Sequence, residues 1–165
     1  WHVPFWIRTH NKDINYLSTP YIQQKPAVVN FVMEIPRGYC FWCHLICSQS
    51  AKTEIATSIS FNPIKQDLKN GALRFYGAPS MINYGAVPQT WENPHKKELT
   101  DVGMFVGDND PLDIMDFSYI PHQVGEVYPV KVYGAIALID QGEMDWKLLG
   151  VSEADPVCKQ LRGTA

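Results

Sequence analysis

Short runs of apolar and β-branched residues recur along the chain, with glycine and proline residues between them. The run over residues 27–35 predicts a strand that ends before Pro36, because proline lacks the backbone donor that a sheet requires. Residues 52–59 alternate between polar and apolar positions, which is typical of a strand with one buried face. Further strands are predicted over residues 73–76, 111–118, 124–132, 133–140 and 145–151.

The pattern as a whole indicates a mainly β fold. No segment shows the periodicity of a long amphipathic helix, and short strands with frequent turns are typical of a barrel or sandwich. Gly125 and Gly134 lie in the longest β-rich stretch and predict bulges or bends there. Residues 7–24 and 38–50 have no periodic pattern, so we expect irregular loops at both.

The composition limits the possible classes of protein but does not identify one. The length of 165 residues fits a single domain, and the net charge of -3 gives no sign of a nucleic-acid partner. No apolar run is long enough for a membrane helix, and residues 1–8 do not resemble a secretory signal. The close spacing of Cys40, Cys43 and Cys47 indicates a reducing compartment rather than a disulfide framework.

A short acidic segment is the most informative part of the chain. Asp108 and Asp110 would share one side of an extended chain, and Asp113 begins the next strand. Carboxylates this close repel one another unless a cation such as Mg²⁺ or Ca²⁺ neutralises them. An EF-hand is excluded, because Asp113 stands where that loop requires glycine and Tyr119 where it requires glutamate. The alternative is a solvated acidic turn.

Two further segments carry charged side chains at every second position. Asp140 and Asp145 are predicted to flank the mouth of a hairpin, with Lys147 on the same face as Asp145. Lys52 and Glu54 repeat this spacing on an earlier strand. A solvated strand face would explain each pair alone, but together the pairs predict a barrel mouth lined by polar side chains.

These segments resemble those of the family I soluble inorganic pyrophosphatases of the eukaryotic type. Asp-Asn-Asp-Pro-Leu-Asp at residues 108–113 is similar to the signature of that family. Other similar segments follow in the order of the family, at residues 33–37, 51–55, 62–67, 73–75, 83–92 and 140–147. The resemblance implies one domain over residues 1–165, built on an OB-like five-stranded β-barrel with the active site at one mouth.

The resemblance also implies an inorganic diphosphatase that uses Mg²⁺ and a metal-activated water to hydrolyse pyrophosphate to two phosphates. By similarity, the metal ligands are Asp108, Asp113 and Asp145 for the first ion and Glu54 and Asp140 for the ions that arrive with substrate. Asp110 matches the general base, Glu34 a second acid of the site, and Lys52, Arg74, Tyr84 and Lys147 the phosphate contacts. Such relatives are usually homodimers in the cytosol or in mitochondria, so we expect a homodimer in the cytoplasm or, alternatively, the mitochondrion.

The chain also departs from the family pattern. Residues 38–51 form an insertion where the family has only a few residues, and Ser80 lies near the place of a missing second tyrosine. The pattern ends after Pro156, so the Tyr-Lys pair that binds phosphate and the C-terminal helices are expected to be absent. The alternative function is therefore a catalytically impaired remnant that binds metal or pairs with an intact relative.

Two other interpretations of local motifs compete with this one. Cys40 to His44 fits the c-type haem attachment pattern, and three cysteines with His44 match a zinc ligand set, but an apolar loop with incidental thiols is the favoured interpretation. An Asp-x-Asp enzyme that binds a sugar nucleotide would need alternating strands and helices, which the sequence does not show.

Overall fold

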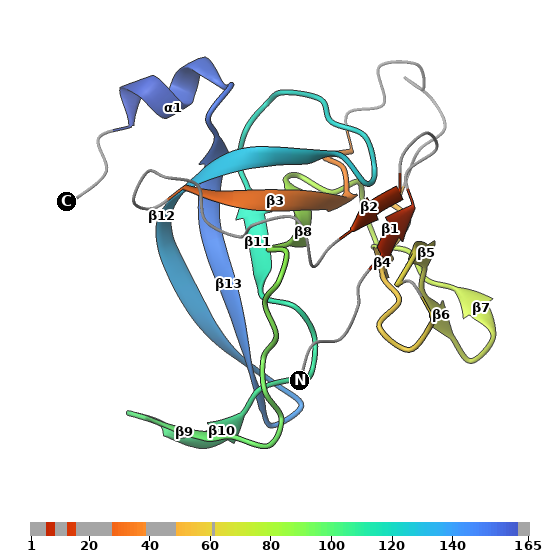
Figure 1. The fold of residues 1–165 in the computed structure, drawn as a ribbon, viewed down its shortest axis with the longest axis vertical. Coiled ribbons are helices and arrows are strands. Elements are labelled where there is room, and N and C mark those ends of the chain that lie inside the picture. The colour runs from red at the N-terminus through yellow and green to blue at the C-terminus, as the bar shows by residue number, and fades with distance from the viewer. Residues whose placement is uncertain (1–5, 9–12, 16–27, 39–48, 61, 162–165) are drawn as a thin grey trace.

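The centre of the protein is a closed five-stranded β-barrel (Figure 1). The structure is a computed structural model that describes residues 6–8, 13–15, 28–38, 49–60 and 62–161. The barrel strands, in spatial order, are β11 (Asp113–Asp116), β13 (Glu143–Ser152), β12 (Val127–Asp140), β3 (Val28–Ile35) and β8 (Asn83–Ala86). Each strand pairs with two neighbours, so the predicted mainly β class and five-stranded barrel are confirmed.

The barrel interior is filled by side chains rather than hollow. Phe31 and Met33 of β3 pack there against Ile114, Tyr128 and Val130, and all five are buried. Because side chains alternate along a strand, the residues between these inward-facing positions lie on the outer wall of the barrel. Glu34, Asp113 and Lys147, three of the charged residues of the sequence analysis, lie on that outer wall.

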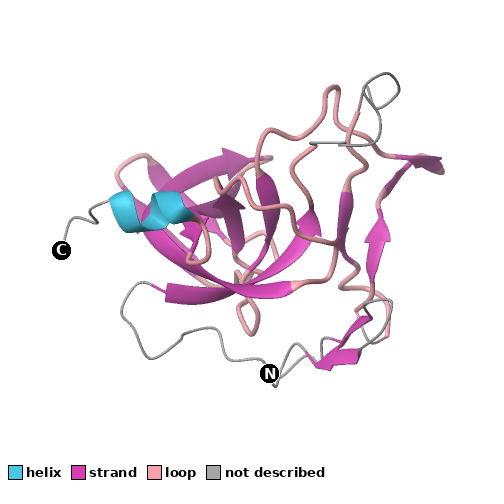
Figure 2. Cartoon of the chain, turned by 90° about the horizontal axis from the view of Figure 1, so that it is seen from above, coloured by secondary structure: helices cyan, strands magenta, loops and turns pink. Residues whose placement is uncertain are grey.

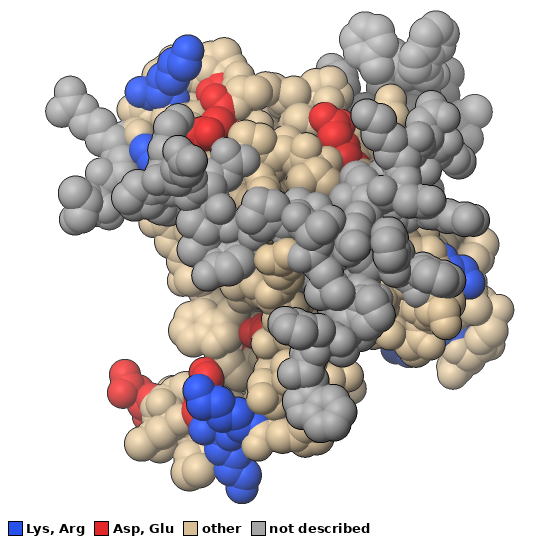
Figure 3. Space-filling view, in the orientation of Figure 1, with Lys and Arg blue, Asp and Glu red and all other residues tan. Residues whose placement is uncertain are grey.

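Short hairpins surround the barrel, and Figure 2 places most of them at the end of the molecule opposite helix α1 (Pro156–Gln160). Three of these hairpins pair β4 (Thr53–Ile55) with β5 (Ile64–Gln66), β6 (Leu68–Lys69) with β7 (Ala72–Leu73), and β9 (Lys97–Thr100) with β10 (Gly103–Val106). Figure 3 shows acidic and basic side chains gathered over the β9–β10 hairpin, where Lys96 and Glu98 lie 3.8 Å apart. The β4–β5 hairpin packs on β3 through Ile55 and covers part of the outer wall.

The long strands agree well with the sequence pattern. The strand predicted at residues 27–35 becomes β3, and the β-rich stretch after Gly125 becomes the single strand β12, with a register shift at the predicted Gly134 bulge. Gly125 lies just before β12 with a φ of 81°, which confirms a bend. The strands predicted over residues 52–59 and 111–118 are shorter than expected. A turn begins at Thr57, and the second strand is paired only over Asp113–Asp116.

The irregular loop expected over residues 7–24 is wrong in part. β1 (Trp6–Arg8) and β2 (Asp13–Asn15) pair there as antiparallel strands that are too short to produce a visible alternation. β8 was also missing from the predicted strands, because Asn83–Ala86 includes a glycine and no β-branched residue. The candidate haem and zinc motif, Cys40 to Cys47, lies outside the described residues.

Helix α1 begins at Pro156, whose fixed φ suits a first helical position. Asp155 caps it, because its Oδ1 accepts the Val157 N–H at 2.9 Å. Across the residues that the structure describes, no helix has the length and apolar character needed to span a bilayer.

Candidate active site

An open cavity of about 590 Å³ lies between the outer barrel wall and the β4–β5 hairpin. The structure brings every site residue suggested by the sequence to this cavity. They are Glu34, Lys52, Glu54, Arg74, Tyr84, Asp108, Asp110, Asp113, Asp140, Asp145 and Lys147.

The cavity lies on the outside of the barrel wall, which differs from the polar barrel mouth expected from the sequence. Ile114 and Leu148 face the core, so their neighbours Asp113 and Lys147 point outward. These two residues are directly paired across β11 and β13. The difference has a steric reason, because the interior of a five-stranded barrel has room only for packed side chains.

The acidic loop before β11 is a tight turn rather than the extended chain that the sequence analysis assumed. Asp108 Oδ1 accepts the Asp110 N–H at 2.9 Å, and Asn109 between them has a φ of 73°. Asparagine tolerates this left-handed conformation better than most residues. The turn therefore brings Asp108 and Asp110 to one cavity by a mechanism other than strand alternation.

Lys147 is the centre of a hydrogen-bonded cluster in the site. Its Nζ donates to Tyr84 Oη at 2.9 Å, to Asp145 Oδ1 at 2.6 Å, and to Asp113 Oδ2. Tyr84 in turn donates to Asp113 Oδ2 at 2.5 Å. Burial alone would lower the pKa of Lys147, but the Asp113 and Asp145 carboxylates outweigh it and raise the pKa. The ammonium is thus held charged among carboxylates.

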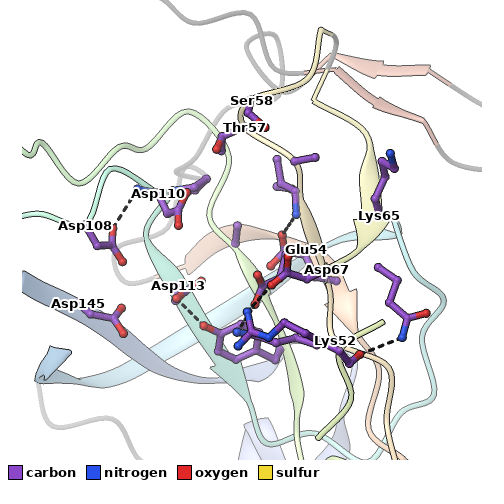
Figure 4. Close-up of a pocket in the computed structure, with 18 of the residues that line it drawn as sticks. Lys52, Glu54, Thr57, Ser58, Lys65, Asp67, Asp108, Asp110, Asp113 and Asp145 are labelled. Carbon is purple, nitrogen blue, oxygen red and sulfur yellow. Dashed lines mark hydrogen bonds and ion pairs between the residues drawn. The ribbon is translucent and has the colours of Figure 1, made fainter. Parts of the chain in front are cut away.

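The opposite side of the cavity carries two ion pairs, and Figure 4 labels three of the side chains that form them, Lys52, Glu54 and Asp67. Lys52 Nζ lies 2.9 Å from Glu54 Oε1, which confirms that these residues share one face. Arg74 pairs with Asp67, and although burial raises the pKa of Asp67, the hydrogen bond from Arg74 brings it below its usual value. Figure 4 places Asp108, Asp110, Asp113 and Asp145 across the cavity from these groups.

Glu34 connects the cavity to the barrel wall. It is 4% exposed, and its Oε1 accepts the Ile55 N–H of β4 at 2.6 Å. Burial, followed by the nearby Asp113 charge, raises its pKa well above the usual value. Glu34 thus links the β4–β5 hairpin to β3 and favours its protonated form.

Burial, together with neighbouring negative charges, also raises the pKa values of other acids in the cavity. Burial, followed by the charges of Asp108 and Asp113, raises the pKa of Asp110 to about 6. Burial raises the pKa of Asp113 to about 6 as well, despite the opposing effect of Lys147. Among the cavity residues, eight are carboxylic and four are cationic. A strongly anionic ligand would be repelled here unless cations accompanied it.

The donor set suits a hard divalent cation. Oxygen ligands of Glu92, Asp108 and Asp145 lie within 4.8 Å of one another, and one oxygen of Glu92 is buried without a hydrogen-bond partner among the described residues. Carboxylate oxygens are the ligands that Mg²⁺ and Ca²⁺ prefer. The acidic side of the cavity therefore fits such an ion.

The sequence analysis missed several cavity residues. Thr57, Ser58 and Lys65 of the β4–β5 hairpin line the cavity but belong to no charge pattern that would have marked them. Glu92 was also missed. It lines a neighbouring pocket with Trp146 rather than this cavity, and the one available signal for it was its place at the end of the segment 83–92 that resembles the pyrophosphatases. Tyr76 lies on the neighbouring surface with Tyr84 and Lys147, close to the place where a second tyrosine was expected to be missing.

The outer wall of the β-barrel thus carries carboxylate oxygens, which suit divalent cations, beside lysine and arginine side chains, which suit anionic groups. The family model described as inorganic pyrophosphatase matches residues 41–164. The chain belongs to this family.

Individual relatives agree with the family match. The chain is 40% identical over 159 residues to an inorganic pyrophosphatase of Dictyostelium discoideum, covering 95% of this chain and 52% of the relative. A Trypanosoma cruzi vacuolar soluble pyrophosphatase, solved in complex with PPi, is 40% identical with a TM-score of 0.74, covering 92% of this chain and 58% of that one. The Schistosoma japonicum inorganic pyrophosphatase is 34% identical with a TM-score of 0.77, covering 95% and 54%. The chain thus spans about half the length of the relatives that it matches.

Proposed function

We propose that the protein hydrolyses inorganic pyrophosphate to two phosphates in the presence of Mg²⁺. The observation that carries the proposal is the convergence of all the expected site residues on one cavity in a member of the pyrophosphatase family. The solved relative with PPi supports the substrate, because that protein shares the fold at 40% identity.

Mg²⁺ would be held by Asp108, Asp113 and Asp145, with Glu54 and Asp140 at the outer edge of the cavity for further ions. When bound, it would supply positive charge against the substrate and lower the pKa of water. The excess of carboxylates in the cavity supports this requirement for cations.

The protein's own side chains would bind the substrate and move the proton. Lys52, Arg74 and Lys147 present cationic groups to one cavity, and Tyr84 adds a hydroxyl donor. Such donors stabilise the charge that develops on departing phosphate. Asp110 would accept the proton of the attacking water, because its pKa of about 6 leaves a carboxylate that is ionised yet basic near neutral pH.

The test is phosphate release from pyrophosphate with millimolar Mg²⁺, comparing the wild-type chain with Asp110→Asn and Asp101→Asn. Asp101 is an exposed carboxylate in the β9–β10 turn and serves as a matched control. We expect metal-dependent release that falls on the order of 10²-fold or more in Asp110→Asn and is unchanged in Asp101→Asn.

A folded wild-type protein that releases no phosphate would overturn the proposal. Binding of Mg²⁺ without turnover would instead support the non-enzymatic alternative. The homodimer and the cytoplasmic or mitochondrial location stay predictions, and light scattering of the purified protein tests the first of them.

A further inference from the structure

Residues 91–93 form a connection between the acidic loop and the rest of the site. The Glu92 N–H donates to the Asp110 carbonyl at 2.9 Å, and the Asn109 N–H donates to the Glu92 carbonyl at 3.0 Å. The Gly107 N–H donates to the Asn93 carbonyl at 3.2 Å. These backbone bonds hold the acidic loop against residues 91–93 along its whole length.

The contact is close enough to require a glycine. A Cβ on Gly107 would lie 2.4 Å from the Glu92 carbonyl carbon, so no other side chain fits without displacing the backbone. Trp91 adds a side-chain bond, because its Nε1 donates to Asn109 Oδ1 at 3.0 Å. The acidic loop and residues 91–93 are therefore one rigid unit.

The Glu92 side chain joins this unit to β13. Its Oε1 accepts the backbone N–H of Trp146 at 3.1 Å, and Trp146 lies between Asp145 and Lys147. A backbone bridge between Gly107 and Met144 links the same two segments on the other side of Asp145. Glu92 thus fixes the strand on which Asp145 is carried relative to the loop on which Asp108 is carried.

We propose that Glu92 is a positioning residue that sets Asp108 and Asp145 at the separation needed for one divalent cation. The inference rests on the proposed function for the identity of the cation but on the structure alone for the link. The bond to Trp146 needs an acceptor of the right length and needs no charge. The second carboxylate oxygen has no partner among the described residues and lies near Asp108 and Asp145, where a negative charge on Glu92 would oppose theirs.

Two substitutions separate the effect of the length of the Glu92 side chain from the effect of its charge. Glu92→Gln keeps an acceptor at the same distance and removes the charge, whereas Glu92→Asp keeps the charge and shortens the side chain by one methylene. In a calorimetric titration with Mg²⁺ and no substrate, we expect Glu92→Gln to bind within about threefold of wild type and Glu92→Asp to bind about 10-fold or more weakly. The reverse order would assign Glu92 as a charged partner of the cation and would overturn the positioning role.

A second measurement keeps this inference separate from the proposed function. Hydrogen exchange at the Trp146 amide, measured without metal, should be about 10-fold faster in Glu92→Asp and unchanged in Glu92→Gln. If the wild-type protein binds no Mg²⁺, the proposed function fails, but the exchange rates still report on the link. Equal exchange rates in all three proteins would overturn the inference.

Discussion

The two ends of strand β11 carry aspartates in opposite environments. Asp116 is fully buried, yet both of its oxygens are satisfied by neutral donors. Its Oδ1 accepts the N–H groups of Ser118 and Ser152, and its Oδ2 accepts from Asn83, Tyr128 and the Ser118 hydroxyl, at distances from 2.7 to 3.0 Å. Asp113, three residues earlier, shares its surroundings with other carboxylates and one ammonium.

The difference separates a carboxylate that stabilises the fold from one that is available for a ligand. Five neutral donors, two of them backbone N–H groups, satisfy Asp116, so no further group needs to bind there. Burial raises the pKa of Asp113 to about 6, and the neighbouring Asp145 charge contributes to this rise. A cation entering the cavity would relieve that cost, and the same cation would gain nothing at Asp116.

The largest effect is expected from Asp113→Asn. We expect turnover of pyrophosphate to fall by about 10²–10³-fold, because the cation loses a ligand while the cavity keeps its shape. Stability without metal should not fall, since the amide removes a charge that the folded state disfavours. Phosphate release and thermal unfolding at about pH 8 measure the two effects. A large loss of stability would place Asp113 with Asp116 as a structural residue.

Asp116→Asn should show the opposite pattern. The new amide group would face N–H and O–H donors, leaving at least one of them unpaired in the core, at a cost of about 3 kcal/mol in the free energy of unfolding. For a domain of this size the melting temperature should fall by about 10 °C. Turnover per folded molecule at low temperature should remain near that of wild type. Stability equal to that of Asp113→Asn would remove the contrast between the two ends of β11.

Lys147 offers a smaller test of the same contrast. Its ammonium occupies the space between Asp113 and Asp145 that a cation would use, so a binding ion must displace it. We expect Lys147→Met to bind Mg²⁺ up to about 10-fold more tightly in a calorimetric titration without substrate, although turnover falls with the lost phosphate contact. Lys65→Met is the matched control, because Lys65 lines the cavity on its exposed side. Equal or weaker binding in Lys147→Met would show that the ammonium does not compete with the ion.

The sequence predicted the charged cluster around Asp113 but not the buried network around Asp116. Charged residues at alternate positions, such as Asp145 and Lys147, were visible because strand alternation places them on one face, and the 2.6 Å contact between them confirms it. The Asp116 network joins Asn83, Tyr128 and Ser152, which lie far apart in the chain. No local pattern reports such a network, since its members meet only when the barrel closes.

Other parts of the site depended on geometry that alternation does not encode. The turn at Asn109 was interpreted as an extended chain, because a positive φ leaves no mark in the pattern of polar residues. The cavity lies on the outer wall because Ile114, and not Asp113, faces the core. Alternation shows that these residues point to opposite faces of β11, but it does not show which face is buried. Glu92 was missed because its partner, the Trp146 N–H, is a backbone group.

The smallest expected effect is the dependence of stability on pH in the absence of metal. The pKa values of Asp110 and Asp113 are raised to about 6 and that of Glu92 to about 8, so the folded state binds more protons than the unfolded state at intermediate pH. Stability is therefore favoured at low pH and should decrease as pH rises through these values, by a few degrees in melting temperature between about pH 5 and about pH 8.

Millimolar Mg²⁺ should reduce or reverse this slope, because the cation binds the deprotonated carboxylates and the folded state gains most from it at high pH. Thermal unfolding across this pH range, with a chelator or with Mg²⁺, measures both slopes. Asp113→Asn should flatten the slope seen with chelator, whereas Asp101→Asn should leave it unchanged, since Asp101 is an exposed residue outside the cavity. If the stability of the metal-free protein rises over this pH range, the proposal that these carboxylates are ligands for a cation is contradicted.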